Sequence, residues 1–265
     1  MSTPAPAPQH DPLTKGPVSG EQFDDDWESH WDAYGGVLTG SPAKPFRYDF
    51  VLKTLRRLGC GSDDLVLELG AGTGDFLGYA GANGFTTLAG VEYAHSGVKR
   101  IRQRLPQAVA QRYDLMEVPD LADWTAPPAA FAVCIEVLEH VDDPVVLLKN
   151  ARAFLAPGCR LVITVPGGPR TTFDKHIGHR QHFTPQKIEE VCRAAGYEVE
   201  RAGRIGFPFF NLYRSVIYLL GSKVQDHATT ESLPKRIFSA VFRFLFKLDV
   251  PCGLGWQVYA IARAR

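Results

Sequence analysis

The stretch LVLELGAGTGDFLG, residues 65–78, combines carboxylates with closely spaced glycines directly after an apolar run. Glycines in a turn between a strand and a helix let backbone N–H groups approach a ligand, because no Cβ stands in the way. Glu68 stands two residues before the first glycine, and Asp75 opens the predicted helix. Two carboxylates beside the loop would repel a pyrophosphate, so they favour a cationic ligand.

The glycine spacing excludes two common nucleotide motifs. Gly70, Gly72 and Gly74 form Gly-x-Gly-x-Gly, whereas the dinucleotide fingerprint is Gly-x-Gly-x-x-Gly. A phosphate-binding loop would continue with Lys-Ser or Lys-Thr, which is missing here. Glu92 follows the loop by about 20 residues, where an acid can accept hydrogen bonds from both hydroxyls of a ribose. Asp114 could accept a hydrogen bond from the amine of adenine, so the pattern predicts a nucleoside without phosphates.

Short β-branched runs alternate with helical segments from residue 63 onward. We expect strands at 65–69, 87–92, 109–115, 130–136, 160–166, 197–204 and 256–264. Thr184 and Pro185 are typical of a helix start, and Gly196 of a helix end. The alternation predicts an α/β fold, a doubly wound sheet that binds its ligand at the carboxyl ends of the strands.

The chain divides into five predicted segments. Residues 1–20 are expected to form a disordered tail, 21–58 an N-terminal helical lid and 59–206 the nucleoside-binding core. Residues 207–250 form an apolar helical insertion, which acts as a lid or a dimer interface, and 251–265 supply the final core strand.

The bulk composition narrows the classes of partner and compartment. The 29 basic and 29 acidic residues cancel, so no global field recruits nucleic acid. Five cysteines without a Cys-x-x-Cys pair argue against disulfides and zinc. We therefore expect a cytoplasmic protein. No uncharged apolar run reaches the ~20 residues that span a bilayer.

Several motifs in order resemble those of class I S-adenosylmethionine-dependent methyltransferases. ELGAGTGDF is similar to the first motif of that family, FAVCIEVLEHVDDP to its fourth-strand motif and LAPGCRLVITVP to its fifth-strand turn, although Ala156 and Cys159 depart from the commonest residues. The fourth-strand motif is similar to that of ubiquinone-pathway O-methyltransferases. The match covers residues 60–204.

The resemblance implies a Rossmann-like sheet of about seven strands with an antiparallel last strand. It also implies S-adenosylmethionine as cofactor and S-adenosylhomocysteine as product. The implied cofactor-binding residues are Glu68, Gly70, Ala71, Gly72, Gly74, Glu92, Tyr93, Asp114, Leu115 and Glu136.

Methyl transfer from a sulfonium is an in-line displacement, so the enzyme must align the nucleophile and in some cases remove a proton. Histidine suits proton removal because its ordinary pKa is near neutrality. The candidate catalytic residues are His182, His179 and His140, with His182 as the base and Phe183 in the substrate wall. His176 is expected only to pack in its loop.

The spacing Glu136-x-x-Glu139-His140 raises a metal alternative. It resembles the acidic cluster of small-RNA 3′-terminal ribose methyltransferases and of ubiquinone-pathway enzymes, in which a divalent ion orients a hydroxyl. His179 is the positional match for a later histidine ligand. We expect no metal, with Glu139 and His140 capping the next helix. Glu136, Glu139, His140 and His179 remain the alternative ligand set.

Residues 207–221 and 234–248 predict two helices, each with a narrow polar stripe and a wide apolar face. The expected role is a hairpin that closes the domain or forms a homodimer interface. The functional alternative is a hydrophobic acceptor pocket, with Tyr34, Phe207, Phe210 and Tyr213 as substrate contacts. Attachment to a membrane surface is a further alternative, because a basic stripe beside an apolar face suits interfacial helices.

The sequence therefore predicts a methyltransferase of small-molecule biosynthesis that acts on a hydrophobic or aromatic metabolite. Oxygen is the first acceptor atom, and nitrogen and carbon stay open. One alternative is metal-assisted 2′-O-methylation of RNA at the terminal ribose, which the zero net charge disfavours. The other is a non-catalytic nucleoside-binding protein.

Overall fold

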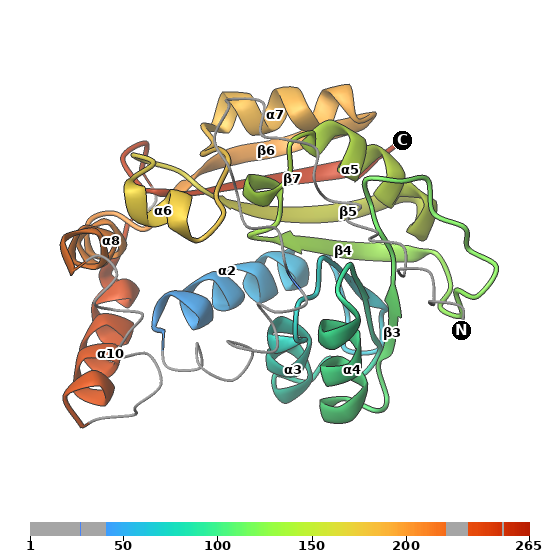
Figure 1. Ribbon diagram of the computed structural model, residues 1–265, viewed down its shortest axis with the longest axis horizontal. Coiled ribbons are helices and arrows are strands. Elements are labelled where there is room, and N and C mark those ends of the chain that lie inside the picture. Colours follow the sequence, from blue (N-terminus) through green and yellow to red (C-terminus); the bar gives the residue numbers. More distant parts are fainter. Residues whose placement is uncertain (1–26, 28–40, 221–232, 251) are drawn as a thin grey trace, which may run out of the picture.

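The computed structural model describes residues 27, 41–220, 233–250 and 252–265. A seven-stranded sheet with the strand order β3-β2-β1-β4-β5-β7-β6 forms its centre (Figure 1). In chain order the strands are β1 Val66–Leu69, β2 Leu88–Glu92, β3 Val109–Arg112, β4 Ala129–Ile135, β5 Leu155–Pro166, β6 Tyr197–Ile205 and β7 Gln257–Ala264.

The strand directions confirm the predicted sheet. Strand β1 pairs in parallel with β2 and β4, and the parallel part continues to β3 on one side and β5 on the other. Strand β7 runs antiparallel to both β5 and β6, so the last strand is antiparallel as expected. The strand order reverses between β1 and β4, and ligands of such sheets bind at this switch point.

Two strand boundaries differ from the expectation by more than one residue. Strand β3 ends at Arg112 instead of 115, because Oδ1 of Asp114 accepts the N–H of Met116 at 2.8 Å and turns the chain. Strand β5 begins at Leu155 instead of 160, because Leu155 already pairs with Ala129 ahead of an irregularity in the β4–β5 register. The side chain of Asp114 therefore lies in a loop past the end of its strand.

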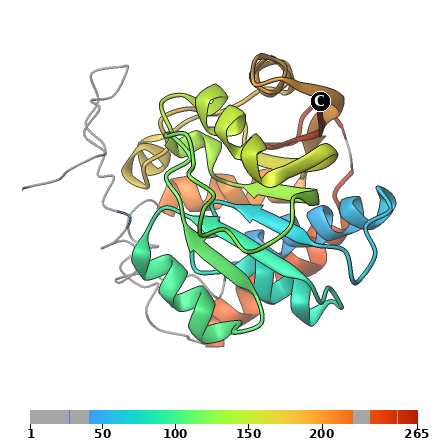
Figure 2. The ribbon, with the colours of Figure 1, turned by 90° about the vertical axis from the view of Figure 1, so that its right-hand side faces the viewer.

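Helices cover both sides of the sheet (Figures 1 and 2). The α-helices are α2 Ala43–Arg57, α3 Asp75–Ala82, α4 His95–Arg104, α5 Pro144–Ala151, α6 Thr172–His176, α7 Pro185–Ala194, α8 Phe209–Leu220 and α10 Leu233–Leu245. The 3-10 helices are η2 Leu138–His140, η3 Arg152–Phe154 and η4 Phe246–Leu248.

Two apolar clusters fill the faces of the sheet. Helices α2, α3 and α4 pack on one face through residues such as Leu55, Phe76 and Ile101. Helices α5 and α7 pack on the other through residues such as Leu148 and Ile188. The predicted limits of α7 are confirmed, because Oγ1 of Thr184 accepts the N–H of Lys187 and Gly196 follows with φ 87°.

Helices α8 and α10 of the predicted insertion lie at the same end of the molecule as α6 (Figure 1). They form a third cluster with α2, made of Phe46, Phe210, Tyr213, Phe242 and Phe246 among others. None of the helices in the described ranges is long and apolar enough to cross a membrane. The predicted tail 1–20 and all of 21–40 except Trp27 lie outside the described residues.

Candidate active site

The loop between β1 and α3 requires glycine for two reasons. Gly70, Gly72 and Gly74 have φ values of 71°, 54° and 76°, a left-handed region that disfavours any Cβ. A Cβ on Gly70 would also lie 2.6 Å from Cγ2 of Val137. The N–H groups of Gly70 and Ala71 both donate to the carbonyl of Val91, each at 2.9 Å. The loop is thus anchored to β2 while it touches the segment after β4.

Glu92 is held between this loop and the start of α4. Its Oε2 accepts the N–H of Gly72 at 2.7 Å, and its Oε1 accepts the N–H of Ala94 at 3.0 Å. A Cβ on Gly97 would lie 2.6 Å from the carbonyl oxygen of Gly72, so the approach of α4 to the loop also needs glycine. A carboxylate oxygen can accept more than one hydrogen bond. Glu92 can therefore bind a hydroxyl while it keeps its backbone contacts.

Glu68, at the centre of β1, is 4% exposed. Its Oε2 has no hydrogen-bond partner among the described residues. Burial, followed by the charges of Asp75 and Glu92, raises the pKa of Glu68 well above its ordinary value. A buried acceptor without a donor is costly and is stabilised by a cationic N–H group. This side chain fits the methionine ammonium of S-adenosylmethionine, as the sequence resemblance implies.

Asp75, the second carboxylate of the loop, is already balanced by cations. It forms ion pairs with Nζ of Lys44 at 2.6 Å and with Nη1 of Arg104 at 2.8 Å. Burial acts to raise the pKa of Asp75, but the contacts to Lys44 and Arg104 outweigh it and lower the pKa. Glu68 is therefore the carboxylate of this pair that has no cation bonded to it among the described residues.

The residues predicted to bind adenosine gather next to Glu92. Arg112 lies 5.3 Å from the ring centroid of Tyr93 and donates through Nε to the Tyr93 carbonyl at 2.8 Å. Leu115 is 7% exposed, and its carbonyl accepts Nδ2 of Asn150 at 3.0 Å. The turn at Asp114 is thus fixed from α5 by a residue that sequence reasoning did not identify.

Glu136 has an unusual backbone and a tightly held side chain. Its φ of 55° is the one positive value at a non-glycine residue in the described part of the chain, and such outliers cluster at functional sites. Oε1 accepts Oγ1 of Thr164 at 3.1 Å and Nε2 of Gln257 at 2.8 Å. Oε2 lies 3.7 Å from Nη1 of Arg47.

Helix α2 contributes two residues that the sequence analysis did not assign to the site. Arg47 pairs with Glu136. Burial, followed by the charges of Glu68 and Asp75, raises the pKa of the Tyr48 hydroxyl. Both effects place α2 between the cofactor loop and the end of β4. Tyr48 belongs to the aromatic residues of the predicted N-terminal lid, but no local pattern distinguishes Arg47 from other surface arginines.

Three histidines gather beyond the carboxyl ends of β4 and β5. Nδ1 of His179 lies 3.1 Å from Nε2 of His182, and the rings of His140 and His179 meet edge to face at 4.9 Å. Nδ1 of His140 donates to Gly178 O at 3.1 Å and Nδ1 of His182 to Gly168 O at 3.3 Å, since a carbonyl only accepts. In neutral rings these bonds leave the lone pairs of His140 and His179 on Nε2.

Asp174 stands behind this cluster and was not identified from the sequence. It is fully buried, and Oδ1 accepts Nη2 of Arg214 at 2.9 Å. The same oxygen lies 3.6 Å from Nε2 of His182 and 3.7 Å from Nδ1 of His179. Burial would raise the pKa of Asp174, but the nearby His182 ring, the hydrogen bonds from Thr171 and the charge of Arg214 lower it. Asp174 is therefore an anion that ties the histidines to α8.

Glu139 is fully buried, and neither of its carboxylate oxygens has a hydrogen-bond partner among the described residues. Burial, followed by the charge of Glu136, raises its pKa well above the ordinary value. Ligand atoms of Glu139, His140 and His179 lie within 4.8 Å of one another. A carboxylate and two imidazoles are suitable ligands for a divalent ion. Burial lowers the pKa of His179, as do the charges of His140 and His182, so this ring is neutral as a ligand must be.

The compact ligand set lacks Glu136, which the predicted alternative included. Glu136 is occupied by Thr164 and Gln257, and it does not belong to the group within 4.8 Å. A second group, Asp174, His179 and His182, is equally compact, but Arg214 already pairs with Asp174. Glu139, His140 and His179 are thus the better ion site of the two groups.

The predicted substrate contacts lie in three different places. Phe183 is 2% exposed and packs in the sheet core, where its N–H donates to Pro166 O at 2.9 Å. Phe210 and Tyr213 are buried in the aromatic cluster of α8 and α10. Phe207 is partly buried and bridges to Val250. Tyr34 lies outside the described residues.

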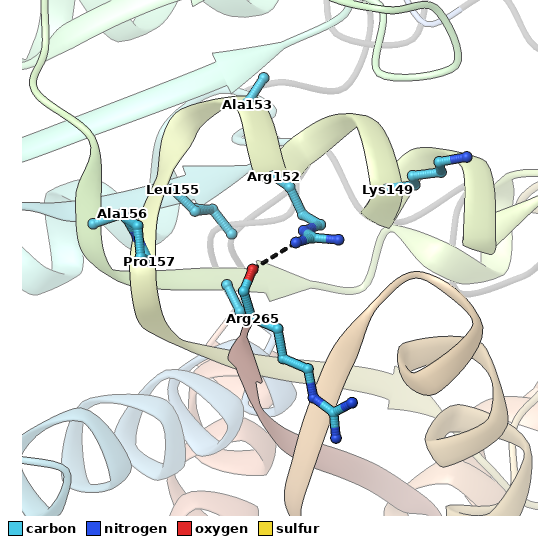
Figure 3. A pocket seen from close by; sticks show the side chains of 8 residues that line it. Lys149, Arg152, Ala153, Leu155, Ala156, Pro157 and Arg265 are labelled. Atoms are coloured by element: carbon cyan, nitrogen blue, oxygen red, sulfur yellow. Dashed lines mark hydrogen bonds between the residues drawn. The ribbon is translucent and has the colours of Figure 1, made fainter.

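A hollow of about 410 Å³ opens at the opposite end of the sheet (Figure 3). Lys149, Arg152 and Arg265 line it, and Nη2 of Arg152 donates to the Arg265 carbonyl at 2.6 Å. It lies at the amino end of β5, whereas the carboxylates and histidines described above lie at the carboxyl ends. The hollow is therefore not part of the candidate site.

Comparisons with known proteins identify a family and a shared fold. A family model described as a methyltransferase domain matches residues 44–202. The ubiquinone biosynthesis O-methyltransferase of Neisseria meningitidis serogroup A / serotype 4A is 25% identical over 192 residues, which span 64% of this chain and 76% of that protein.

Among solved structures, a SAM-dependent methyltransferase of Thermotoga maritima has a TM-score of 0.54 and 15% identity, and the match covers 89% of this chain and 96% of that one. Phosphoethanolamine N-methyltransferase 2 of Haemonchus contortus, solved with phosphomonomethylethanolamine and S-adenosylhomocysteine, has a TM-score of 0.56 and 14% identity over 91% of this chain and 60% of that one. At such identities the structures show a shared fold.

Proposed function

The chain belongs to the methyltransferase domain family, and we propose that it transfers the methyl group of S-adenosylmethionine to a hydroxyl oxygen of a small, hydrophobic or aromatic metabolite. The family membership makes the chain an S-adenosylmethionine-dependent methyltransferase. The name of its Neisseria relative supports oxygen as the acceptor atom. When bound, the cofactor supplies an electrophilic methyl group on a positively charged sulfur.

The proposed cofactor site runs from Glu68 to Leu115 along the carboxyl edge of the sheet. The unpartnered oxygen of Glu68 accepts the methionine ammonium. The oxygens of Glu92, already fixed by two backbone N–H groups, accept the ribose hydroxyls. Asp114 and Leu115 border the adenine. Gly70, Ala71, Gly72, Gly74, Tyr93 and Glu136 complete the cofactor contacts.

The observation that carries the proposed acceptor chemistry is the buried carboxylate of Glu139, which has no hydrogen-bond partner among the described residues and lies beside two imidazoles. Although the sequence analysis favours a metal-free site, this group fits a divalent ion. Glu139 and Nε2 of His140 and His179 would hold the ion. A bound ion supplies Lewis acidity, which lowers the pKa of a coordinated hydroxyl. Oxygen acceptors need such activation at neutral pH, because an alcohol is a poor nucleophile until its proton leaves.

The remaining members of the cluster position the ligands. Both ring nitrogens of His182, the base in the sequence analysis, already have protein partners. His182 therefore orients His179 by accepting its Nδ1–H, and a hydrogen bond on the second ring nitrogen is the usual way in which a ligating histidine is fixed. Asp174 lies 3.7 Å from Nδ1 of His179, the nitrogen that donates to His182, and Arg214 balances the charge of Asp174.

Aromatic side chains support an apolar acceptor. Phe46 stacks on Phe210 with ring centroids 4.8 Å apart, and it stands directly before Arg47 and Tyr48 in α2. The wall beside the methyl-transfer region is thus apolar where Phe46 of α2 meets Phe210 of α8, and charged on the β4 side. This contrast fits a hydroxyl group carried on a hydrophobic body.

The test is turnover with S-adenosylmethionine and a panel of phenols and catechols, compared with amines and an RNA with a free 3′-terminal ribose. We expect S-adenosylhomocysteine to form with hydroxyl compounds, and their O-methylated counterparts to be inert. Turnover of RNA alone would favour terminal-ribose methylation. Tight S-adenosylhomocysteine binding without turnover of any acceptor would favour the non-catalytic alternative.

The ion is tested separately with Glu139→Gln, matched by the exposed Glu198→Gln as control. We expect Glu139→Gln to abolish stimulation by Mg²⁺ or Mn²⁺ and to leave S-adenosylhomocysteine binding unchanged. If Glu139→Gln turned over at the full rate without an added ion, proton removal would be assigned to the histidines alone.

A further inference from the structure

Exposed apolar side chains are concentrated on one part of the molecule. Ten large hydrophobic residues are exposed among those the structure describes, and nine of them lie between 212 and 254. The exception is Val118, which is 85% exposed in the loop before β4. Single exposed apolar residues need no explanation, whereas a group of this size marks an interaction surface.

Helix α10 and its continuation η4 carry most of this surface. The inner side presents Phe238, Phe242 and Phe246 to Tyr213 of α8. The outer side carries five exposed apolar residues at helical spacing, Leu233, Ile237, Val241, Phe244 and Leu248. At 100° per residue the first four, in α10, fall within an arc of about 80°, and Leu248 follows in the 3-10 helix η4. We call these five residues the outer stripe.

A row of cations follows one side of the outer stripe. Arg236, Arg243 and Lys247 are all exposed. At 100° per residue Arg236 and Arg243 fall within about 20° of one another on α10, next to the stripe, and Lys247 follows in η4. Residues 233–248 contain no Asp or Glu. The next acid along the chain, Asp249, accepts the N–H groups of Phe209 and Phe210 at the start of α8. The outer side of α10 is therefore apolar and purely basic.

We propose that the outer stripe and its basic row bind the surface of a membrane that contains anionic phospholipids. An exposed apolar stripe beside basic residues lets a helix lie in the plane of the interface, with apolar side chains below the headgroups and cations among the phosphates. Since the aromatic inner side already anchors α10 to the protein, the helix needs no folding on contact with the lipid.

Charge makes a second copy of this chain the poorer occupant. A symmetric dimer through the outer stripe would place two copies of Arg236, Arg243 and Lys247 along one interface. Residues 233–248 offer no carboxylate to pair with them, and like charges across an interface are repulsive. Anionic headgroups neutralise the same row.

Membrane contact would also bring a hydrophobic acceptor close to the candidate site, a consequence that rests on the proposed function. Phe246, in η4 directly after α10, contacts Phe46 with ring centroids 5.1 Å apart. Phe46 is adjacent in sequence to Arg47, which pairs with Glu136. An acceptor dissolved in the bilayer would therefore lie beside the helix layer that borders the methyl-transfer region.

The experiment is vesicle co-sedimentation of the full chain at low ionic strength. One set of vesicles is pure phosphatidylcholine, and the other contains phosphatidylglycerol. We expect binding to the anionic vesicles, little binding to the neutral ones, and release by salt. The variant Arg236→Glu/Lys247→Glu should bind at least 20-fold more weakly, since each cation near such a surface contributes about a factor of five. Val241→Asp/Phe244→Ser should lose at least tenfold.

Matched variants separate a specific surface from a general effect. Val118→Asp changes an exposed apolar residue elsewhere, and Lys53→Glu/Arg57→Glu makes the same charge change on exposed positions of α2. Both should bind like the natural chain. Thermal protection by S-adenosylhomocysteine should be equal in all variants, which shows that they are folded. This readout also separates failure of membrane binding from failure of the proposed methyl transfer.

Two results would overturn the proposal. One is absence of binding to phosphatidylglycerol vesicles, or equal binding by the stripe variants and the natural chain. The other is a protein that does not bind vesicles and forms a dimer in sedimentation velocity, which Val241→Asp/Phe244→Ser dissociates. The latter result would assign the outer stripe to a second copy.

Discussion

Replacing Glu68 by Gln should weaken cofactor binding while it stabilises the ligand-free protein. Glu68 is 4% exposed and has one carboxylate oxygen without a partner among the described residues. In the complex this oxygen is proposed to accept a charged N–H, and hydrogen bonds to charged groups contribute about 1.5–3 kcal/mol. The dissociation constant of S-adenosylhomocysteine should therefore rise about 10- to 100-fold, as measured by calorimetry.

The stability effect of this variant has a defined pH dependence. Burial and the neighbouring carboxylates raise the pKa of Glu68 in the folded protein, so the folded state binds its proton more tightly than the unfolded chain does. The protonated Glu68 side chain therefore contributes to stability below the pKa that it has in the unfolded chain, and this contribution is lost as pH rises toward its pKa in the folded protein. Glu68→Gln does not titrate. Urea unfolding from pH 5 to 7 should therefore show its stability advantage growing by up to about 1.4 kcal/mol per pH unit.

Exposed Glu198→Gln is the matched control and should change neither quantity. Contributions from Glu139, whose pKa is also raised, cancel because both proteins contain it. The reasoning would be refuted by S-adenosylhomocysteine affinity within twofold of the natural chain, or by a stability difference that does not widen with pH.

Three further changes probe the loop, the buried anion and the ion site. Gly70→Ala should lower the free energy of unfolding in urea by at least 1–2 kcal/mol, roughly the penalty of a left-handed Cβ. Adding Val137→Ala to this variant should relieve only the contact with the new Cβ, and full recovery of stability would contradict the backbone argument. Asp174→Asn leaves Arg214 buried without its anion, so a loss of about 3–5 kcal/mol is expected, and an unchanged unfolding midpoint would refute the pairing. Dialysis against a chelator should lower turnover at least tenfold, Mn²⁺ or Mg²⁺ should restore it, and metal content should follow activity in elemental analysis.

The sequence predicts the parts of the site that depend on local pattern. Gly72 and Glu92 were assigned from their spacing along the unit β1–α3–β2, and the structure joins them by a hydrogen bond of 2.7 Å. All seven strands were expected, because alternation of apolar runs reports which residues lie inside a sheet. Asp114 shows the limit of this reasoning, since its own side chain ends β3 early.

Contacts between residues far apart in the sequence leave no local pattern from which they could be predicted. Asp174 and Arg214 are 40 residues apart, and neither stands in a motif. Arg47 reaches Glu136 only because α2 packs beside the cofactor loop. The polar stripe predicted on 207–221 was treated as one face of an apolar helix. In the structure this stripe faces the protein, where Arg214 contacts Asp174 and Asn211 contacts Trp256. Phe183, next to His182 in the sequence, was expected in the substrate wall, but it packs in the core of the sheet.

The most direct test of the account is the position of the transferred methyl group. Product made from S-adenosylmethionine with a ¹³C-labelled methyl and a phenolic, apolar acceptor should carry the label on oxygen when analysed by NMR. A label on nitrogen or carbon of the acceptor would contradict the proposed activation of a hydroxyl beside Glu139, His140 and His179.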